Sequence, residues 1–241
     1  MENGQMGRET IIVLWIVAAA MTIGLIAFSI TTISARGKSK FFSSTFVIIT
    51  LIAALSYVAM ASGLGSIGQA DHVVLIARPI GWVFTTPLLL LDLALIALPR
   101  VHWRTPLIIF LLSADVTMII TGSISAFIRS NDRWGWFGSG VAAFVVLLYL
   151  VVQFMREAHQ RDPQIARHFR VLSTCLIGLW ICYPIVWALG TEGLGIISIF
   201  IETVLFGTLD VLATVGFGFI LLSNPGALER TEITGFAFLG S

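Results

Sequence analysis

The chain has little charge and almost no lysine. Of its 241 residues only 11% are Asp, Glu, Lys or Arg, and 57% are hydrophobic, whereas a soluble domain carries about 25% charged residues. This balance excludes a disordered chain, and it leaves a soluble enzyme too few polar side chains to cover its surface. The net charge of +1 gives no global field for nucleic acid, so we expect no nucleic-acid partner. The composition predicts an integral membrane protein.

Cysteine is also scarce, with only Cys175 and Cys182 in the chain. They lie seven residues apart in one apolar run, which is a rise of about 10 Å along a helix. A disulfide needs Cα atoms within about 7 Å, so we predict free thiols. The sequence shows no nucleophile–base pair, metal-ligand cluster or phosphate loop, and we expect neither a metal site nor an enzyme.

Long apolar runs are what the chain does have. A membrane-spanning helix needs about 20 apolar residues, and runs of that length fit helices rather than the short alternating strands of a barrel. The sequence therefore predicts an all-α membrane protein, a seven-transmembrane-helix bundle over residues 1–223, followed by a short, poorly ordered cytoplasmic tail at 224–241. The predicted spans are roughly 10–35, 41–65, 73–98, 105–128, 134–156, 169–190 and 195–223.

Basic residues are unevenly divided between the two ends of this bundle. The first, third and fifth connectors together with the tail hold ten Lys and Arg, whereas the N-terminus and the other connectors hold three. Cytoplasmic loops are enriched in Lys and Arg. The distribution predicts an N-terminus outside and a C-terminus in the cytoplasm, for a protein of the plasma membrane.

Five ionisable side chains fall inside or near the predicted spans: Arg78, Asp92, Asp115, Glu202 and Asp210. Charge at bilayer depth is costly, so each is a functional candidate. The plainer interpretation is that they pair inside the bundle and only fix helix packing. We expect Arg78 and Asp210 to form a buried pair, directly or through water.

Several sequence segments resemble those of a known family and occur in the same order along the chain. They are Ala77–Asp92, Asp115–Met118 with Gly122, Trp180–Trp187, Glu192 and Glu202, and Leu209–Gly218. These strings resemble the third, fourth and sixth helices, the outer acidic pair and the seventh helix of the microbial rhodopsins, the bacteriorhodopsin group. The resemblance covers nearly the whole chain and implies that fold. It also implies a homo-oligomer, since family members often form trimers.

The resemblance further implies a retinal pocket walled by aromatic side chains, which would otherwise be taken for core or interfacial residues. Trp82 and Trp180 would lie on either side of the polyene, and Tyr57 and Tyr183 would flank Asp210. The implied pocket residues are Trp82, Thr85, Thr86, Met118, Gly122, Phe137, Trp180, Tyr183, Trp187, Asp210 and Thr214. The implied remnants of a proton path or its ion pairs are Tyr57, Arg78, Gly81, Asp92, Asp115, Glu192 and Glu202.

Two positions depart from the family pattern. The family carries its retinal on a lysine of the seventh helix in the pattern Asp-Val-x-Ala-Lys, and Thr214 stands at that position here. The only lysines, Lys38 and Lys40, lie in the first connector. Gly81 stands where the proton pumps have the aspartate that accepts the proton. The sequence therefore predicts no covalent retinal.

Three hypotheses remain open. The first is a non-pumping, opsin-related protein that lacks the retinal lysine. The second is a photoreceptor, or a relative of the light-driven proton pumps, that binds retinal or another apolar ligand without a covalent bond. The third is a pump or sensor whose lysine was replaced by engineering, although the additional change at Gly81 favours natural divergence.

Overall fold

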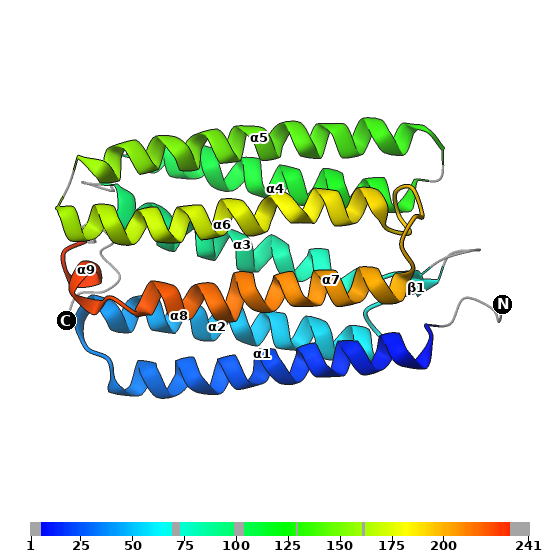
Figure 1. The fold of residues 1–241 in the computed structure, drawn as a ribbon, viewed down its shortest axis with the longest axis horizontal. Helices are drawn as coiled ribbons and strands as arrows, with labels where there is room; N and C mark the ends of the chain where they lie inside the picture. Colours follow the sequence, from blue (N-terminus) through cyan, green and yellow to red (C-terminus); the bar gives the residue numbers. More distant parts are fainter. Residues whose placement is uncertain (1–5, 69–72, 99–103, 129, 161, 232–241) are drawn as a thin grey trace.

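Seven long helices lie side by side along the long axis of the molecule (Figure 1). The computed structural model describes residues 6–68, 73–98, 104–128, 130–160 and 162–231. Seven helical segments of this part are long and apolar enough to cross a membrane. They are α1 (Arg8–Ser34), α2 (Gly37–Ala61), α3 (Ala77–Ala97), α4 (Thr105–Phe127), α5 (Asp132–His159), α6 (Pro163–Leu189), and a seventh built from α7 (Ile199–Val211), the π-helix η2 (Leu212–Gly216) and α8 (Phe217–Leu222). The predicted seven-span bundle is confirmed.

The predicted ends of some spans differ from the observed helix ends, mainly where apolar residues lie outside the helices. The second span ends at Ala61, and a short antiparallel hairpin of β1 (Ile67–Gly68) and β2 (Val73–Val74) precedes α3. Val73 and Val74 are apolar and buried but form β2. The predicted third span was therefore too long at its start, because hydropathy does not distinguish this strand from a helix. The sixth helix begins earlier than predicted, because its first turns are polar and lower the mean hydropathy of this segment. These turns are nevertheless helical, and Asp162 caps them by accepting a hydrogen bond from the Gln164 N–H at 2.8 Å.

The outer surface of the bundle is apolar, as a lipid-facing surface must be. Ile16, Ile23 and Ile30 of α1 are spaced seven residues apart, which places them on one helix face, and they are 60–68% exposed. Inside, the helices approach closely at small residues. A Cβ at Gly218 would lie 2.6 Å from the rings of Phe28 and Phe46, so the contact between the seventh span and its neighbours requires glycine there.

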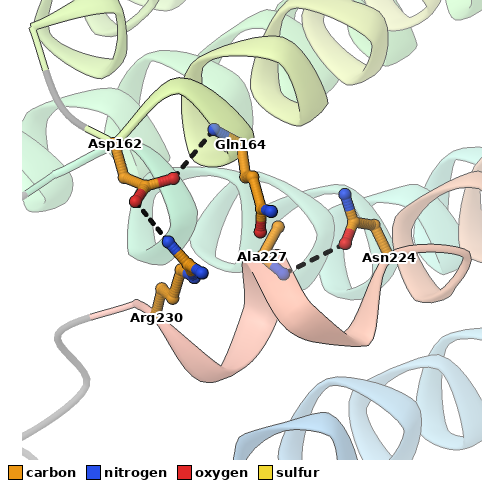
Figure 2. A network of polar contacts seen from close by, with 5 residues as sticks. All are labelled: Asp162, Gln164, Asn224, Ala227 and Arg230. Carbon is orange, nitrogen blue, oxygen red and sulfur yellow. Dashed lines mark hydrogen bonds and ion pairs between the residues drawn. The ribbon is translucent and has the colours of Figure 1, made fainter.

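The first residues of the predicted tail are ordered. A short helix, α9 (Pro225–Glu229), follows the seventh span, with the Asn224 side chain accepting from the Ala227 N–H at 3.1 Å. Figure 2 shows Arg230 bonded to the Asp162 carboxylate at the start of α6. Hydrogen bonds from the Gln164 N–H and the Arg230 guanidinium hold the pKa of Asp162 below its usual value. The expectation of a poorly ordered tail is therefore wrong for residues 224–231, because buried contacts and an ion pair fix them.

Other expectations remain predictions. Residues 232–241 of the tail, the Pro99–Arg100 connector and the basic residues Arg129 and Arg161 lie outside the described residues. The start of α1 and the short helix α9 lie at opposite ends of the bundle (Figure 1), as an odd number of spans requires. Which end faces the cytoplasm is still inferred from the distribution of charge. A trimeric assembly likewise stays a prediction.

Candidate functional site

A cavity of about 180 Å³ lies inside the bundle between α3, α4, α5, α6 and the seventh span. Its walls are mostly apolar and aromatic, and Phe144 and Phe206 join the predicted aromatic residues there. All the pocket residues implied by the resemblance border this one cavity. They are Trp82, Thr85, Thr86, Met118, Gly122, Phe137, Trp180, Tyr183, Trp187, Asp210 and Thr214. Residues from these five spans, with Ile49 of α2, thus meet around a single space of the kind that binds small apolar molecules.

Asp210 is the polar centre of the cavity and is 5% exposed. Tyr57 of α2 donates to its Oδ2 at 2.5 Å, and Tyr183 of α6 donates to its Oδ1 at 2.8 Å. The indole N–H of Trp82 on α3 donates to the same Oδ1 at 3.1 Å. Three neutral donors from three helices therefore satisfy both carboxylate oxygens.

Arg78 does not make the direct contact with Asp210 that the sequence suggested. Its guanidinium lies over the Phe206 ring, 4.7 Å from the ring centroid. Its Nε and Nη2 are buried without a hydrogen-bond partner in the part of the chain that the structure describes. Asp210 instead accepts from Tyr57, Tyr183 and Trp82. A bridge through water stays a prediction.

Gly81 is buried on α3 but points toward α2 rather than into the cavity. A Cβ at this position would lie 2.5 Å from the Ser56 Oγ and 3.3 Å from its Cβ. The Ser56 hydroxyl is itself bonded to the Ile52 carbonyl at 3.0 Å. The residue at the position of the family's proton acceptor is thus packed against a serine, and a larger side chain would have to displace that serine.

The two other acidic residues inside the spans lie apart from each other. Asp115 of α4 lies 2.6 Å from the Thr86 hydroxyl, which is also 2.9 Å from the Trp82 carbonyl one turn earlier. This contact ties α4 to the turn of α3 that contains Pro87. Asp92 is fully buried, and neither of its oxygens has a hydrogen-bond partner among the described residues. It does not border the cavity.

The outer acidic pair lies at the end of the cavity opposite Asp92. Glu202 accepts from the backbone N–H and the hydroxyl of Thr191, at 2.8 and 2.9 Å. Glu192, in the loop between α6 and α7, borders the cavity. Burial raises the pKa of Glu192 to about 7, the negative Glu202 adds to the shift, and Arg78 opposes it. No group of three metal-ligating side chains occurs within the described ranges.

Comparison with known proteins decides the family. Residues 8–225 match the family model described as bacteriorhodopsin-like protein. The chain belongs to the bacteriorhodopsin-like family. It is similar to the bacteriorhodopsin of Haloterrigena sp. (strain arg-4), with 41% identity over 226 residues, 90% of this chain and 88% of that protein. Its structure is similar to the thermophilic rhodopsin of Rubrobacter xylanophilus, with a TM-score of 0.89, 42% identity, and coverage of 91% and 97% of the two chains.

A further structural relative is a proton pump. The rhodopsin of Coccomyxa subellipsoidea, described as a light-driven proton pump, has a TM-score of 0.84 and 30% identity over 91% of this chain and 98% of that one. As a microbial rhodopsin, the present chain is an integral, multi-pass membrane protein of a family of pumps and receptors rather than enzymes.

In this rhodopsin, Thr214 borders the cavity from within the π-helical turn of the seventh span. Such turns frequently occur at functional sites, since they locally widen the helix. Neither lysine is near it. Lys38 donates to the Glu229 and Thr231 carbonyls in the tail, and Lys40 lies two residues further along the same first turn of α2. The side chain at 214 is therefore a hydroxyl, with no amine available to replace it.

Besides Phe144 in the cavity wall, sequence reasoning missed Phe206, Ser56 and Thr191. Phe206 lies four residues before Asp210, and the helical period alone would have placed both on one face. Ser56 and Thr191 carry no such signal, because their contacts with Gly81 and Glu202 join elements that are distant or irregular.

We expect the stability of the rhodopsin to depend on Glu192 in a pH-dependent way. Its folded-state pKa of about 7 exceeds the usual 4.5, so the folded state holds this proton more tightly. Stability from the proton is present below about pH 4.5 and is lost as the pH rises through 7. Glu192→Gln should therefore stabilise the protein at pH 9 by about 1–3 kcal/mol relative to wild type and have little effect at pH 4. Thermal unfolding at both pH values measures this, and an equal shift at both would contradict it.

Proposed function

We propose that this rhodopsin forms no retinal Schiff base and is a non-pumping, opsin-related membrane protein. The observation that carries the proposal is Thr214, which borders the cavity at the position of the family's retinal lysine. An imine requires a primary amine, and a threonine hydroxyl cannot form one. The only two lysines of the chain are in the first turn of α2.

Two further features support the absence of pumping. Gly81 offers no carboxylate at the position of the proton acceptor, and it packs against Ser56. Asp92, at the position of the family's proton donor, is buried away from the cavity. A proton relay needs titrating groups along its path, and here it would lack its acceptor.

A second candidate function is non-covalent binding of retinal or another apolar ligand. The cavity favours it, because its aromatic walls remain although the lysine is gone. An engineered apolar cavity of about 150 Å³ takes up benzene, so a space of about 180 Å³ lined by Trp82, Trp180 and Phe137 is large enough for an apolar guest.

The test of the principal proposal is an absorption spectrum of the purified protein with and without all-trans retinal. We expect no new band in the visible range, since free retinal absorbs far to the blue of a protonated Schiff base. In liposomes, illumination should likewise produce no change of pH. A red-shifted band that survives denaturation as a covalent adduct would overturn the proposal, and so would light-driven acidification that an uncoupler abolishes.

A further inference from the structure

The polar groups that border the cavity are not balanced. Asp210 accepts three hydrogen bonds, so each of its oxygens has at least one donor. Arg78 borders the same cavity, is 6% exposed, and has two N–H-bearing atoms, Nε and Nη2, without a partner among the described residues. Beside the carboxyl groups of Asp210 and Glu192, this cavity thus borders a buried cation whose N–H groups lack acceptors.

Buried N–H groups of a cation that lack an acceptor are costly, and an anion that accepts from them offsets the cost. The planar guanidinium presents its donors in a fixed fork that matches the two oxygens of a carboxylate. The guanidinium carbon of Arg78 lies over the Phe206 ring, 4.7 Å from its centroid. Its free donors are at the edge, which is the geometry for an in-plane carboxylate.

The rest of the cavity suits the apolar part of such a molecule. Its wall on α3 runs from Arg78 to Leu89. Leu89 lies eleven positions after Arg78, which corresponds to a rise of about 16 Å along the helix. Beyond the arginine, Trp82, Phe144 and Trp180 provide aromatic surface. A long apolar body would therefore extend from the arginine toward Thr214 and Trp180.

We propose that the cavity binds an apolar monocarboxylate, with the carboxylate on Arg78 and the hydrocarbon between Trp82 and Trp180. The inference rests on the proposed function in one respect: the cavity is not filled by covalently bound retinal. It differs from the second candidate above because it assigns the ligand an anionic head and names the residue that recognises it.

Charges around the arginine predict how binding depends on pH. Glu192 from the α6–α7 loop, Glu202 and Asp210 from α7, Tyr57 from α2 and Tyr183 from α6 surround Arg78. The carboxyl of Glu192 borders the cavity, and its pKa of about 7 lies in the accessible range. Between pH 6 and 8.5 its ionisation adds negative charge near the bound carboxylate. Binding should weaken severalfold over this interval, and Glu192→Gln should remove the dependence.

The experiment titrates the purified full chain in detergent with all-trans retinoic acid and, separately, with retinol. Both carry the same apolar body, and only the first is anionic at pH 6. Quenching of tryptophan fluorescence reports binding, because Trp82, Trp180 and Trp187 border the cavity. We expect retinoate to bind about tenfold more tightly than retinol or better, and Arg78→Gln to abolish this preference by weakening retinoate binding far more than retinol binding. Arg133→Gln is the matched control, since its Nε is also unpartnered but it does not border the cavity.

The outcomes separate the two proposals. Equal affinity of the wild type for retinoate and retinol would overturn the anionic head, whether or not Arg78→Gln folds, and would leave the non-covalent function standing. A preference that persists in Arg78→Gln would overturn the role of Arg78. Binding of neither probe would overturn both the inference and the non-covalent candidate, while the absence of a Schiff base would still be judged by the retinal spectrum.

Discussion

Thr214→Lys is expected to convert the protein into a covalent pigment that absorbs visible light after addition of all-trans retinal. Residue 214 borders the cavity, and it lies four residues after Asp210, so both side chains share one helix face. A lysine there would enter the pocket beside an existing carboxylate. The negative charge of Asp210 would stabilise the protonated imine, which is the form that absorbs in the visible range.

Absorption spectroscopy before and after denaturation measures the result. The matched control is Thr208→Lys, the same substitution on an exposed position of the same helix, which should give no pigment. If Thr214→Lys folds yet takes up no retinal, the aromatic residues are packing residues only. The non-covalent ligand hypothesis would then fail with them.

A proton acceptor should be harder to restore than the pigment. Thr214→Lys alone should bind retinal but pump poorly, because Gly81 provides no acceptor. Adding Gly81→Asp introduces a Cβ that would lie 2.5 Å from the Ser56 Oγ. We therefore expect the triple variant with Ser56→Gly to fold better than the double variant, and light-induced pH changes in liposomes to appear only when position 81 is acidic.

Asp210→Ala is expected to destabilise the protein more than any substitution on its surface. The change leaves Tyr57, Trp82 and Tyr183 as buried donors without their acceptor. It also removes a carboxylate whose negative charge stabilises the buried Arg78 cation. Breaking a buried charged network by removing one partner costs about 3–5 kcal/mol. Thermal unfolding in detergent measures the loss.

Two controls define the effect. Asp210→Asn keeps the shape and one acceptor oxygen, so its loss should be smaller. Glu9→Ala, on an exposed position of α1, should change the melting temperature little. Glu229→Ala is a poorer comparison, because the Glu229 carboxylate accepts from the Ser39 backbone N–H at 3.0 Å at the start of α2. A loss at Asp210→Ala no larger than at Glu9→Ala would show that the three donors find other partners.

The number of spans and the residues around the cavity could be predicted from the sequence. Each span is a local property, since a run of about 20 apolar residues forms a helix in a bilayer whatever its neighbours are. The strings that resemble the third, fourth, sixth and seventh helices of the family contain all the predicted pocket residues except Phe137. Thr214, Gly81 and the positions of both lysines are also facts of sequence alone.

The tertiary structure decided how the charged groups are satisfied. Asp210 receives donors from positions 57, 82 and 183, and no spacing in the sequence shows which helices supply them or that they displace Arg78. The direction of Gly81 toward Ser56 and the anchoring of α9 through Asp162 and Arg230 have the same origin. Hydropathy reports whether a segment enters the membrane, whereas the partner of each buried polar atom depends on which helix faces meet.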